Sequence, residues 1–175
     1  MKLIRQFFNR DTLLVARELL GKYLVRQLNG EIIVGKIIET EAYCGPNDLA
    51  SHASKGLTPR TKIMFGSPGY TYVYMIYGIY HCLNIVTERE GYPAAILIRA
   101  AEIPNYKFQI TNGPGKLCRE LKIDKSLNGI DLITSNELWV QDGGEIIKPS
   151  QIKKSKRIGV DYAGAWKDKL WRFSL

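Results

Sequence analysis

The sequence predicts a single α+β domain that spans residues 1–175, with a curved, mostly antiparallel β-sheet core, flanking helices and a protruding β-hairpin. Three observations support this class. The chain of 175 residues and 19.9 kDa has the size of one domain that can bury a substantial core. Runs rich in β-branched and aromatic residues recur along it, and several are joined by turn signals. Capped helical patterns are few and short, so we expect them to flank the sheet.

The first elements are a helix and a hairpin. Asp11 precedes TLLVARELL and Gly21 follows it, which predicts a capped amphipathic helix of about three turns. The runs KYLVRQL and EIIVGKIIETEAY flank Asn29-Gly30, the kind of dipeptide that a type I′ turn prefers. They therefore predict two paired strands.

The middle and the end of the chain continue the sheet. The runs YTYVYMIYG, YHCLNIVT and AAILIRA predict three further strands. In NGPGKLCREL, Pro114 follows a glycine turn and predicts the start of a helix. Short strands are expected around ELWV and EIIK, with Asp142-Gly143-Gly144 as the turn between them.

The chain is basic. Twenty-five Lys and Arg residues against seventeen Asp and Glu residues give a formal charge of +8 and a pI near 9.4. Such a charge suits a polyanionic partner such as nucleic acid, or an anionic membrane surface. A net charge that serves only to keep the protein in solution explains the basic composition equally well.

The cysteines and the hydrophobic pattern indicate the compartment. Cys44, Cys82 and Cys118 are odd in number and widely spaced, which argues against a disulfide framework and a structural zinc site. Buried, reduced thiols are expected. The start, MKLIRQFFNRDTLL, is no signal peptide because each short apolar run carries a charge. No uncharged apolar run approaches membrane-spanning length, so we expect a cytoplasmic protein.

Two carboxylates stand on one predicted strand. Glu39 and Glu41 are two residues apart in IIETEAY, so both side chains leave the same face. A buried carboxylate is costly unless it is paired or used. Two explanations remain open: a general base whose pKa is raised by burial, or a structural carboxylate bonded to the backbone or to an arginine.

Three other polar residues stand out. His52 lies in the loop GPNDLASHASKG, where a histidine is more often a surface residue than a ligand. No metal-binding spacing appears around it, so no metal is expected. Asn84 and Arg99 interrupt apolar strands, where a buried polar group needs partners and a buried arginine needs an anion.

The segment GYTYVYMIYGIYHCLNI concentrates the aromatic residues. Its tyrosines are spaced by two and then by three, with a glycine at position 78 where the spacing changes: Tyr70, Tyr72, Tyr74, Tyr77 and Tyr80. Rings spaced in this way can face different directions from one hairpin. Stacking of a base on a ring contributes about 1–3 kcal/mol, which can offset the few kcal/mol that flipping a nucleotide costs.

These features together describe a nucleic-acid enzyme, and two alternatives stay open. A binding-only module for single strands would need the rings and the charge but neither Glu41 nor Arg99. A carbohydrate hydrolase would use Glu39 and Glu41 as its carboxylate pair. A basic surface and an exposed tyrosine would then have no purpose.

The stretch from GKIIETEAYCGPNDLASHASKG to YVYMIYGIYHCLNIV resembles the alkyladenine DNA glycosylases, also called 3-methyladenine or N-methylpurine DNA glycosylases, in their short bacterial form. The similarity continues through ILIRAAEI, NGPGKLCRELKIDKSLNGIDL and RIGVDYAGAW. It covers nearly the whole chain in order. The block E-T-E-A-Y, followed by H, Y-V-Y-x-I-Y-G-x-Y and N, is highly specific.

The resemblance implies excision of damaged, alkylated or deaminated purines by hydrolysis of the N-glycosidic bond, with no lyase step and no metal or organic cofactor. Glu41 matches the general base that activates the attacking water. Arg99 and the backbone carbonyl of Ile158 match the groups that help to hold this water. Glu39 matches the family pattern without a catalytic role and is expected to be structural.

The resemblance also implies how the substrate is held. Tyr43, His52 and Tyr74 match the walls that sandwich the flipped base, and the main chain of His52 matches the group that reads the edge of the base. Asn84 matches the residue that crowds the 2-amino group of guanine. Tyr77 matches the ring that enters the minor groove.

The implied partner is double-stranded DNA that contains damaged purines. We expect a monomer without a required protein partner or a membrane, associated with the nucleoid. The residues expected on the DNA, besides Tyr77, are the turn glycine and a basic cluster near the end of the chain: Gly78, Lys153, Lys154, Lys156 and Arg157.

Overall fold

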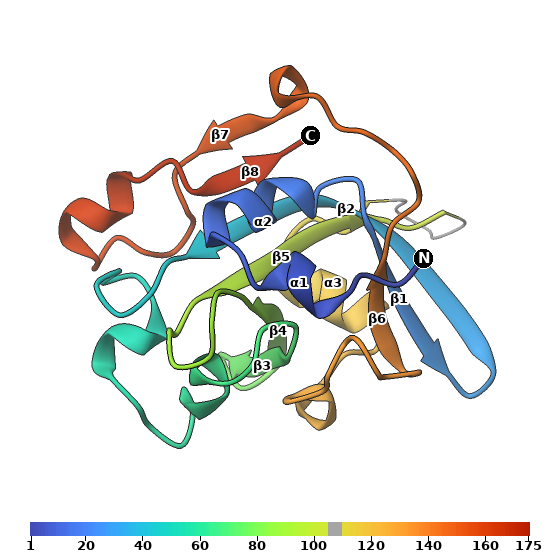
Figure 1. Cartoon of the computed structure of the whole chain (residues 1–175), viewed down its shortest axis with the longest axis horizontal. Helices are drawn as coiled ribbons and strands as arrows, with labels where there is room; N and C mark the ends of the chain where they lie inside the picture. The colour runs from blue at the N-terminus through green and yellow to red at the C-terminus, as the bar shows by residue number, and fades with distance from the viewer. Residues whose placement is uncertain (105–109) are drawn as a thin grey trace.

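A computed structural model of the chain describes residues 1–104 and 110–175, which form one compact α+β domain (Figure 1). Within these residues one eight-stranded sheet has the order β3-β4-β5-β2-β1-β6, with β8 paired to β2 and β7 paired to β8. All neighbouring strands are antiparallel. The strands are β1 (Tyr23–Leu28), β2 (Glu31–Tyr43), β3 (Thr71–Ile76), β4 (Tyr80–Val86), β5 (Ala95–Glu102), β6 (Leu138–Gln141), β7 (Lys153–Ser155) and β8 (Arg172–Ser174).

The helices are short. They are α1 (Arg5–Phe8), α2 (Thr12–Glu18) and α3 (Pro114–Glu120). The Asp11 side chain accepts a hydrogen bond from the backbone N–H of Leu14 and caps α2 as predicted, although α2 has seven residues, about two turns rather than three. Pro114 is the first residue of α3, as the sequence indicated.

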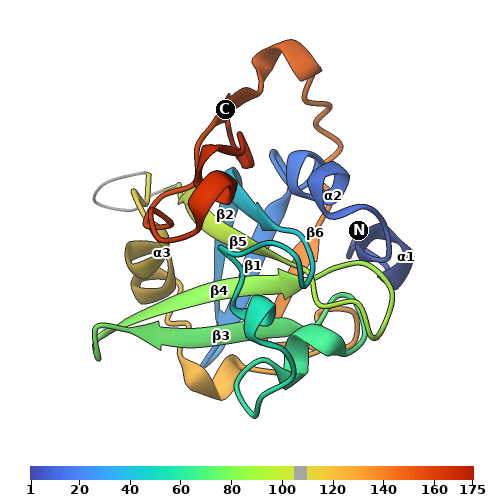
Figure 2. The ribbon, with the colours of Figure 1, turned by 90° about the vertical axis from the view of Figure 1, so that its left-hand side faces the viewer.

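The Asn29-Gly30 turn is of the type that the sequence predicts, and the tip of the second hairpin lies at Tyr77 and Gly78, as expected. Asn29 and Gly30 have φ values of 52° and 83°, and Tyr77 and Gly78 have φ values of 52° and 72°. Type I′ turns require positive φ at both central residues. The β3–β4 hairpin therefore reverses at Tyr77-Gly78, and Figure 2 shows it projecting away from the body of the molecule.

Strand alternation divides the sheet into a core face and an open face. Leu83 and Ile85 of β4, like Ile96 and Ile98 of β5, belong to the main hydrophobic core, which also receives side chains from α2 and α3. Their neighbours in sequence point the other way, since successive side chains of a strand alternate between faces. The open face therefore collects the polar and aromatic residues of these strands.

One expectation about secondary structure is wrong, and two short strands were not expected. Residues 145–148 form no strand, because Glu145 turns to an ion pair with Lys36, 2.6 Å away, and Ile146 is 87% exposed. The short strands β7 and β8 were not predicted.

In the described part of the chain no helix is long and apolar enough to cross a membrane. Cys82 and Cys118 are buried free thiols, as expected, whereas Cys44 is half-buried.

Candidate active site

A cavity of about 350 Å³ opens on the open face of the sheet, within the range of about 300–1,000 Å³ usual for small-molecule sites. Its lining comes from β2, β3, β4, β5, the 3₁₀ helix at His52–Lys55 and the segment around Ile158. The residues that sequence analysis singled out and that line it are Tyr43, His52, Tyr74, Tyr77, Asn84, Arg99 and Ile158. Residues that are far apart in the sequence thus meet at one cavity.

Glu41 is completely buried and does not itself line the cavity, but its partners Tyr43, Arg99 and Ile158 do. Its Oε1 accepts a hydrogen bond from the backbone N–H of Ile158 at 2.8 Å, and its Oε2 accepts one from the Tyr43 hydroxyl at 2.9 Å. Nη1 of Arg99 is 3.5 Å from Oε1. Burial raises the pKa of Glu41 above its usual value, although Arg99 and the two hydrogen bonds oppose the shift. The result is a carboxylate that is more basic than usual and held in one orientation.

Glu39 has a different environment, although it lies only two residues from Glu41 on β2. It accepts from Nε of Arg99 at 3.2 Å and from Nη1 of Arg172 at 2.9 Å. The register of β2 against β5 shifts on both sides of Glu39, and such bulges redirect side chains. Arg99 lies at this irregularity and contacts both carboxylates. Two guanidinium groups therefore hold Glu39, in agreement with a structural role.

Aromatic residues form one wall of the cavity. The rings of His52 and Tyr74 lie edge to face, with centroids 4.7 Å apart. Nδ1 of His52 is 2.9 Å from the Tyr72 hydroxyl, which also accepts from Nε of Arg60. Burial, and then the charges of Arg60 and Lys55, lower the pKa of His52 to about 4. His52 is thus a neutral ring of the cavity at pH 7.

Tyr72 and Arg60 were missed by sequence analysis as parts of the site. Tyr72 could have been found, because it is two residues from Tyr74 on a strand and shares its face. The guanidinium of Arg60 lies 5.1 Å from the centroid of the Tyr74 ring. No local sequence signal connected Arg60 to this wall.

Asn84 is buried, as expected, and lines the cavity from β4. Its Nδ2 donates to the backbone carbonyl of Tyr72 at 3.1 Å. This bond orients the side chain and holds it in place. A fixed side chain of this kind can limit which groups enter the cavity.

Tyr77 is 88% exposed at the tip of the β3–β4 hairpin. A positive φ is strained for a bulky residue, and the φ of Tyr77 is 52°. Met75 and Ile79 of the same hairpin are also exposed, at 49% and 68%. An apolar tip of this kind, next to a cavity, indicates a binding surface.

The basic cluster is not uniform. Lys153 and Lys154 are exposed on β7, and Lys156 is exposed in an ion pair with Asp168. Arg157 is only 4% exposed, so its expected contact with DNA is wrong. Its guanidinium is directed inward to Asp48, a partner that sequence analysis could not assign because it lies 109 residues earlier.

The fold and the site define a class of protein: a basic α+β domain with a buried carboxylate next to an aromatic cavity. The chain belongs to the methylpurine-DNA glycosylase (MPG) family, whose model matches residues 6–175. This is a family of DNA-repair hydrolases that act on alkylated purines, so its substrate is DNA.

Similar proteins have names of the same kind. One from Methanocella arvoryzae is 52% identical over 182 residues, which cover 97% of this chain and 90% of that protein. One from Legionella pneumophila (strain Paris) is 52% identical over 175 residues, covering 99% and 94%. One from Clostridium perfringens (strain 13 / Type A) is 47% identical over 196 residues, covering 100% and 96%. Each is named "Putative 3-methyladenine DNA glycosylase".

Proposed function

We propose that this chain flips damaged purines, alkylated or deaminated, out of duplex DNA and hydrolyses the N-glycosidic bond with a water that Glu41 activates. The observation that carries the proposal is the position of Glu41, completely buried beside an aromatic cavity with both oxygens oriented by donors. A structural carboxylate in this place would only need partners. A carboxylate with a raised pKa, directly behind the cavity-lining residues Tyr43, Arg99 and Ile158, can also accept a proton.

The chemistry needs one proton acceptor and one leaving group. Glu41 takes a proton from the water, the water oxygen bonds to C1′ of the sugar, and the base leaves with the electrons of the glycosidic bond. An alkylated, cationic purine is already a good leaving group. A positioned general base contributes about 10²–10⁴-fold, and orientation in the cavity supplies the rest.

Two groups help to hold the water in this proposal. Arg99 lies within 3.5 Å of Glu41 and can donate toward an oxygen at the same place. At Ile158 the group directed to Glu41 is the backbone N–H. The neighbouring carbonyl of Ile158 remains our assignment for the water.

The shape of the site suits a flipped base. His52 and Tyr74 supply one aromatic wall, and Tyr43 lines the cavity from β2. We assign the edge of the base to the main chain of His52, and the exclusion of the guanine 2-amino group to Asn84. Stacking contributes about 1–3 kcal/mol per ring and so offsets the few kcal/mol that unstacking costs.

The hairpin tip and the exposed lysines face the DNA in this proposal. Tyr77 next to Gly78 occupies the gap that the flipped nucleotide leaves. Lys153, Lys154 and Lys156 contact phosphates. The enzyme works as a monomer, without a metal or an organic cofactor.

The reaction ends at hydrolysis. A lyase step needs an amine that attacks C1′ to form a Schiff base. Among the described residues, the cavity lining includes no lysine. We therefore propose a monofunctional enzyme.

The carbohydrate-hydrolase alternative has less support. Such an enzyme needs two carboxyl groups that both reach the sugar, whereas Arg99 and Arg172 already hold the Glu39 carboxylate in ion pairs. A binding-only module, in turn, gives no reason for the buried Glu41.

Incubation with methylated duplex DNA tests the proposal. Chromatography should detect free methylated purine, while the DNA backbone stays intact until alkali is added. EDTA should not change the rate, and a chelator-sensitive rate would contradict the cofactor-free mechanism. Direct strand cleavage would contradict the monofunctional assignment, and the absence of any free base would refute the proposed function.

A further inference from the structure

Arg157 and Asp48 form an ion pair in which both side chains are completely buried. Nη1 and Nη2 of Arg157 donate to the two carboxylate oxygens of Asp48 at 2.5 and 2.9 Å. An isolated charge in this place would be very costly, and breaking a buried pair by removing one partner is strongly destabilising. Two well-packed apolar residues would often be as stable, so stability alone does not explain why a charged pair stands here.

The Arg157 side chain connects separate parts of the chain. It donates to the carbonyl of Ala42, the residue after Glu41, at 2.9 Å, and to the carbonyl of Trp166 at 3.2 Å. Its guanidinium also lies 4.8 Å from the centroid of the Tyr43 ring. One guanidinium group thus contacts the residues that follow the proposed base and the segment around Trp166.

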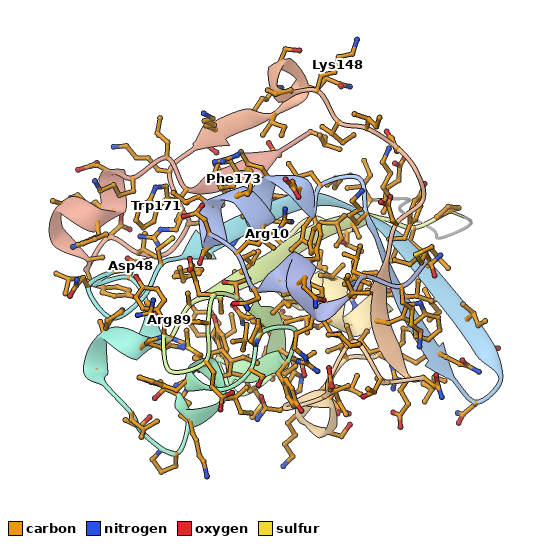
Figure 3. The ribbon with its side chains drawn as sticks, in the orientation of Figure 1. Arg10, Asp48, Arg89, Lys148, Trp171 and Phe173 are labelled. Carbon is orange, nitrogen blue, oxygen red and sulfur yellow. The ribbon has the colours of Figure 1, made fainter. Side chains whose placement is uncertain are left out.

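Asp48 extends these connections to the loop that precedes His52. Its carboxylate accepts from the backbone N–H groups of Cys44 and Ala50, in the loop that leads to His52. Figure 3 labels Asp48 and Trp171 near one another at one end of the molecule, and the guanidinium of Arg157 lies 5.0 Å from the Trp171 ring. The pair therefore connects the loop that precedes His52 with the segment that contains Ile158.

We propose that Arg157, held by Asp48, is a positioning residue for Glu41. Arg157 immediately precedes Ile158, whose N–H donates to Oε1 of Glu41 at 2.8 Å. Anchoring Arg157 fixes the position of this donor. Its contacts with Ala42 and the Tyr43 ring fix the backbone that follows Glu41 and the second donor, the Tyr43 hydroxyl. This inference rests on the proposed function of Glu41 as the base.

The pH dependence of the reaction reports this role. The ionisable groups facing Glu41 are Arg99 from β5, Cys82 from β4, and Glu39 and Tyr43 from β2 itself. The segment that follows Arg157 contributes only one group that faces Glu41, the uncharged backbone N–H of Ile158. That donor favours the ionised form and so lowers the pKa of Glu41. Losing it must raise the pKa of Glu41 further, because the carboxylate loses a partner that the protonated acid does not need.

Arg157→Lys tests the inference, because it keeps the charge but cannot make the same set of bonds. We expect single-turnover base excision to slow about 10- to 100-fold. The excision rate falls at low pH as Glu41 is protonated, and we expect this acid limb of the pH–rate profile to move up by about one pH unit. The affinity for DNA should stay unchanged. The matched control is Arg26→Lys. Arg26 is also buried and donates to two backbone carbonyls, but it lies on β1 away from the cavity. The acid limb of the pH–rate profile of this variant should not move.

The double variant Asp48→Asn/Arg157→Met separates positioning from stability. It removes both charges together, which is often neutral for stability, yet it also removes the bonds to Ala42 and Trp166. A folded double variant should still show the slower rate and the shifted limb. A double variant with the wild-type rate and limb would overturn the inference, as would an unshifted limb in Arg157→Lys. Failure of both variants to fold would assign the pair to stability alone and would also overturn it.

Glu41→Gln in the same assay keeps the two hypotheses apart. If Glu41→Gln still releases bases, the proposed function fails. If Glu41→Gln is inactive and Arg157→Lys has the wild-type limb, only the positioning role fails.

Discussion

Replacing Glu41 by glutamine should abolish most of the catalysis while it preserves the site. The amide oxygen can still accept from the Ile158 N–H, 2.8 Å from the present carboxylate. The amide nitrogen can then donate to the oxygen of Tyr43, whose hydroxyl is free to rotate. Arg99 keeps an ion pair with Glu39, so no buried charge is left unpaired. We therefore expect the variant to fold and to bind DNA.

The size of the loss follows from the chemistry. An amide cannot take the proton of water, so the contribution of a positioned base disappears, about 10²–10⁴-fold. This factor corresponds to about 3–5 kcal/mol of transition-state stabilisation. The measurement is single-turnover release of one methylated purine from duplex DNA, with binding followed separately by fluorescence anisotropy.

The pH profile of the wild-type enzyme gives a second measure of the same residue. The base must be ionised, so the rate should fall as the pH decreases through the pKa of Glu41. Because burial raises this pKa above 4.5, the acid limb should lie above the pH expected for an exposed glutamate.

Glu39→Gln is the matched control. It removes a carboxylate from the same strand, and its cost should appear mainly in thermal stability, because Arg99 and Arg172 both lose a partner. Its base release should exceed that of Glu41→Gln by a wide margin. If Glu39→Gln is the inactive variant and Glu41→Gln still excises, the assignment of the base is wrong.

Further predictions concern the other residues of the site. Tyr77→Ala should slow excision strongly from paired DNA and weakly from a bulged site, where unstacking is cheap, and equal losses in single-turnover assays of both substrates would contradict a role in filling the gap. Asn84→Ala should increase release of guanine-type bases relative to adenine-type bases, and an equal loss of both would leave Asn84 as a packing residue. The His52 ring should titrate near pH 4 by NMR, because burial lowers its pKa, and a value near 6.5 would refute the buried wall. The exposed lysines that we expect on the DNA are Lys153, Lys154 and Lys156. Neutralising them should reduce the slope of log affinity against log salt by about 0.9 for each phosphate that the protein no longer neutralises. An unchanged slope would show that these side chains bind no phosphate.

Much of the fold was predictable because its signals are local. The Asn29-Gly30 and Tyr77-Gly78 turns need positive φ values, and the flanking runs alternate as strands do. Residues 145–148 misled the prediction, because a short apolar pair looks like a strand whether or not a neighbouring edge is free. There Glu145 pairs with Lys36 instead. The strands β7 and β8 have three residues each, too few for a recognisable pattern.

The residues of the candidate site also divide into those with a local sequence signal and those without one. Glu41, Asn84 and Arg99 were identifiable because a polar residue in an apolar strand is conspicuous over a few positions. Arg157 was misassigned, since five basic residues between positions 148 and 157 look like an exposed cluster. Only the folded chain shows which member of the cluster points inward.

The sequence by itself determined the period-two alternation of the strands, the turns of both hairpins and therefore the set of side chains that share the open face of the sheet. The tertiary structure alone decided which distant groups meet there: Ile158 with Glu41, 117 residues apart, and Arg157 with Asp48, 109 residues apart. The physical reason is the sequence separation over which each effect acts. Backbone geometry and strand alternation act over a few residues, whereas a buried charge takes its partner from whatever the completed fold places within hydrogen-bonding distance.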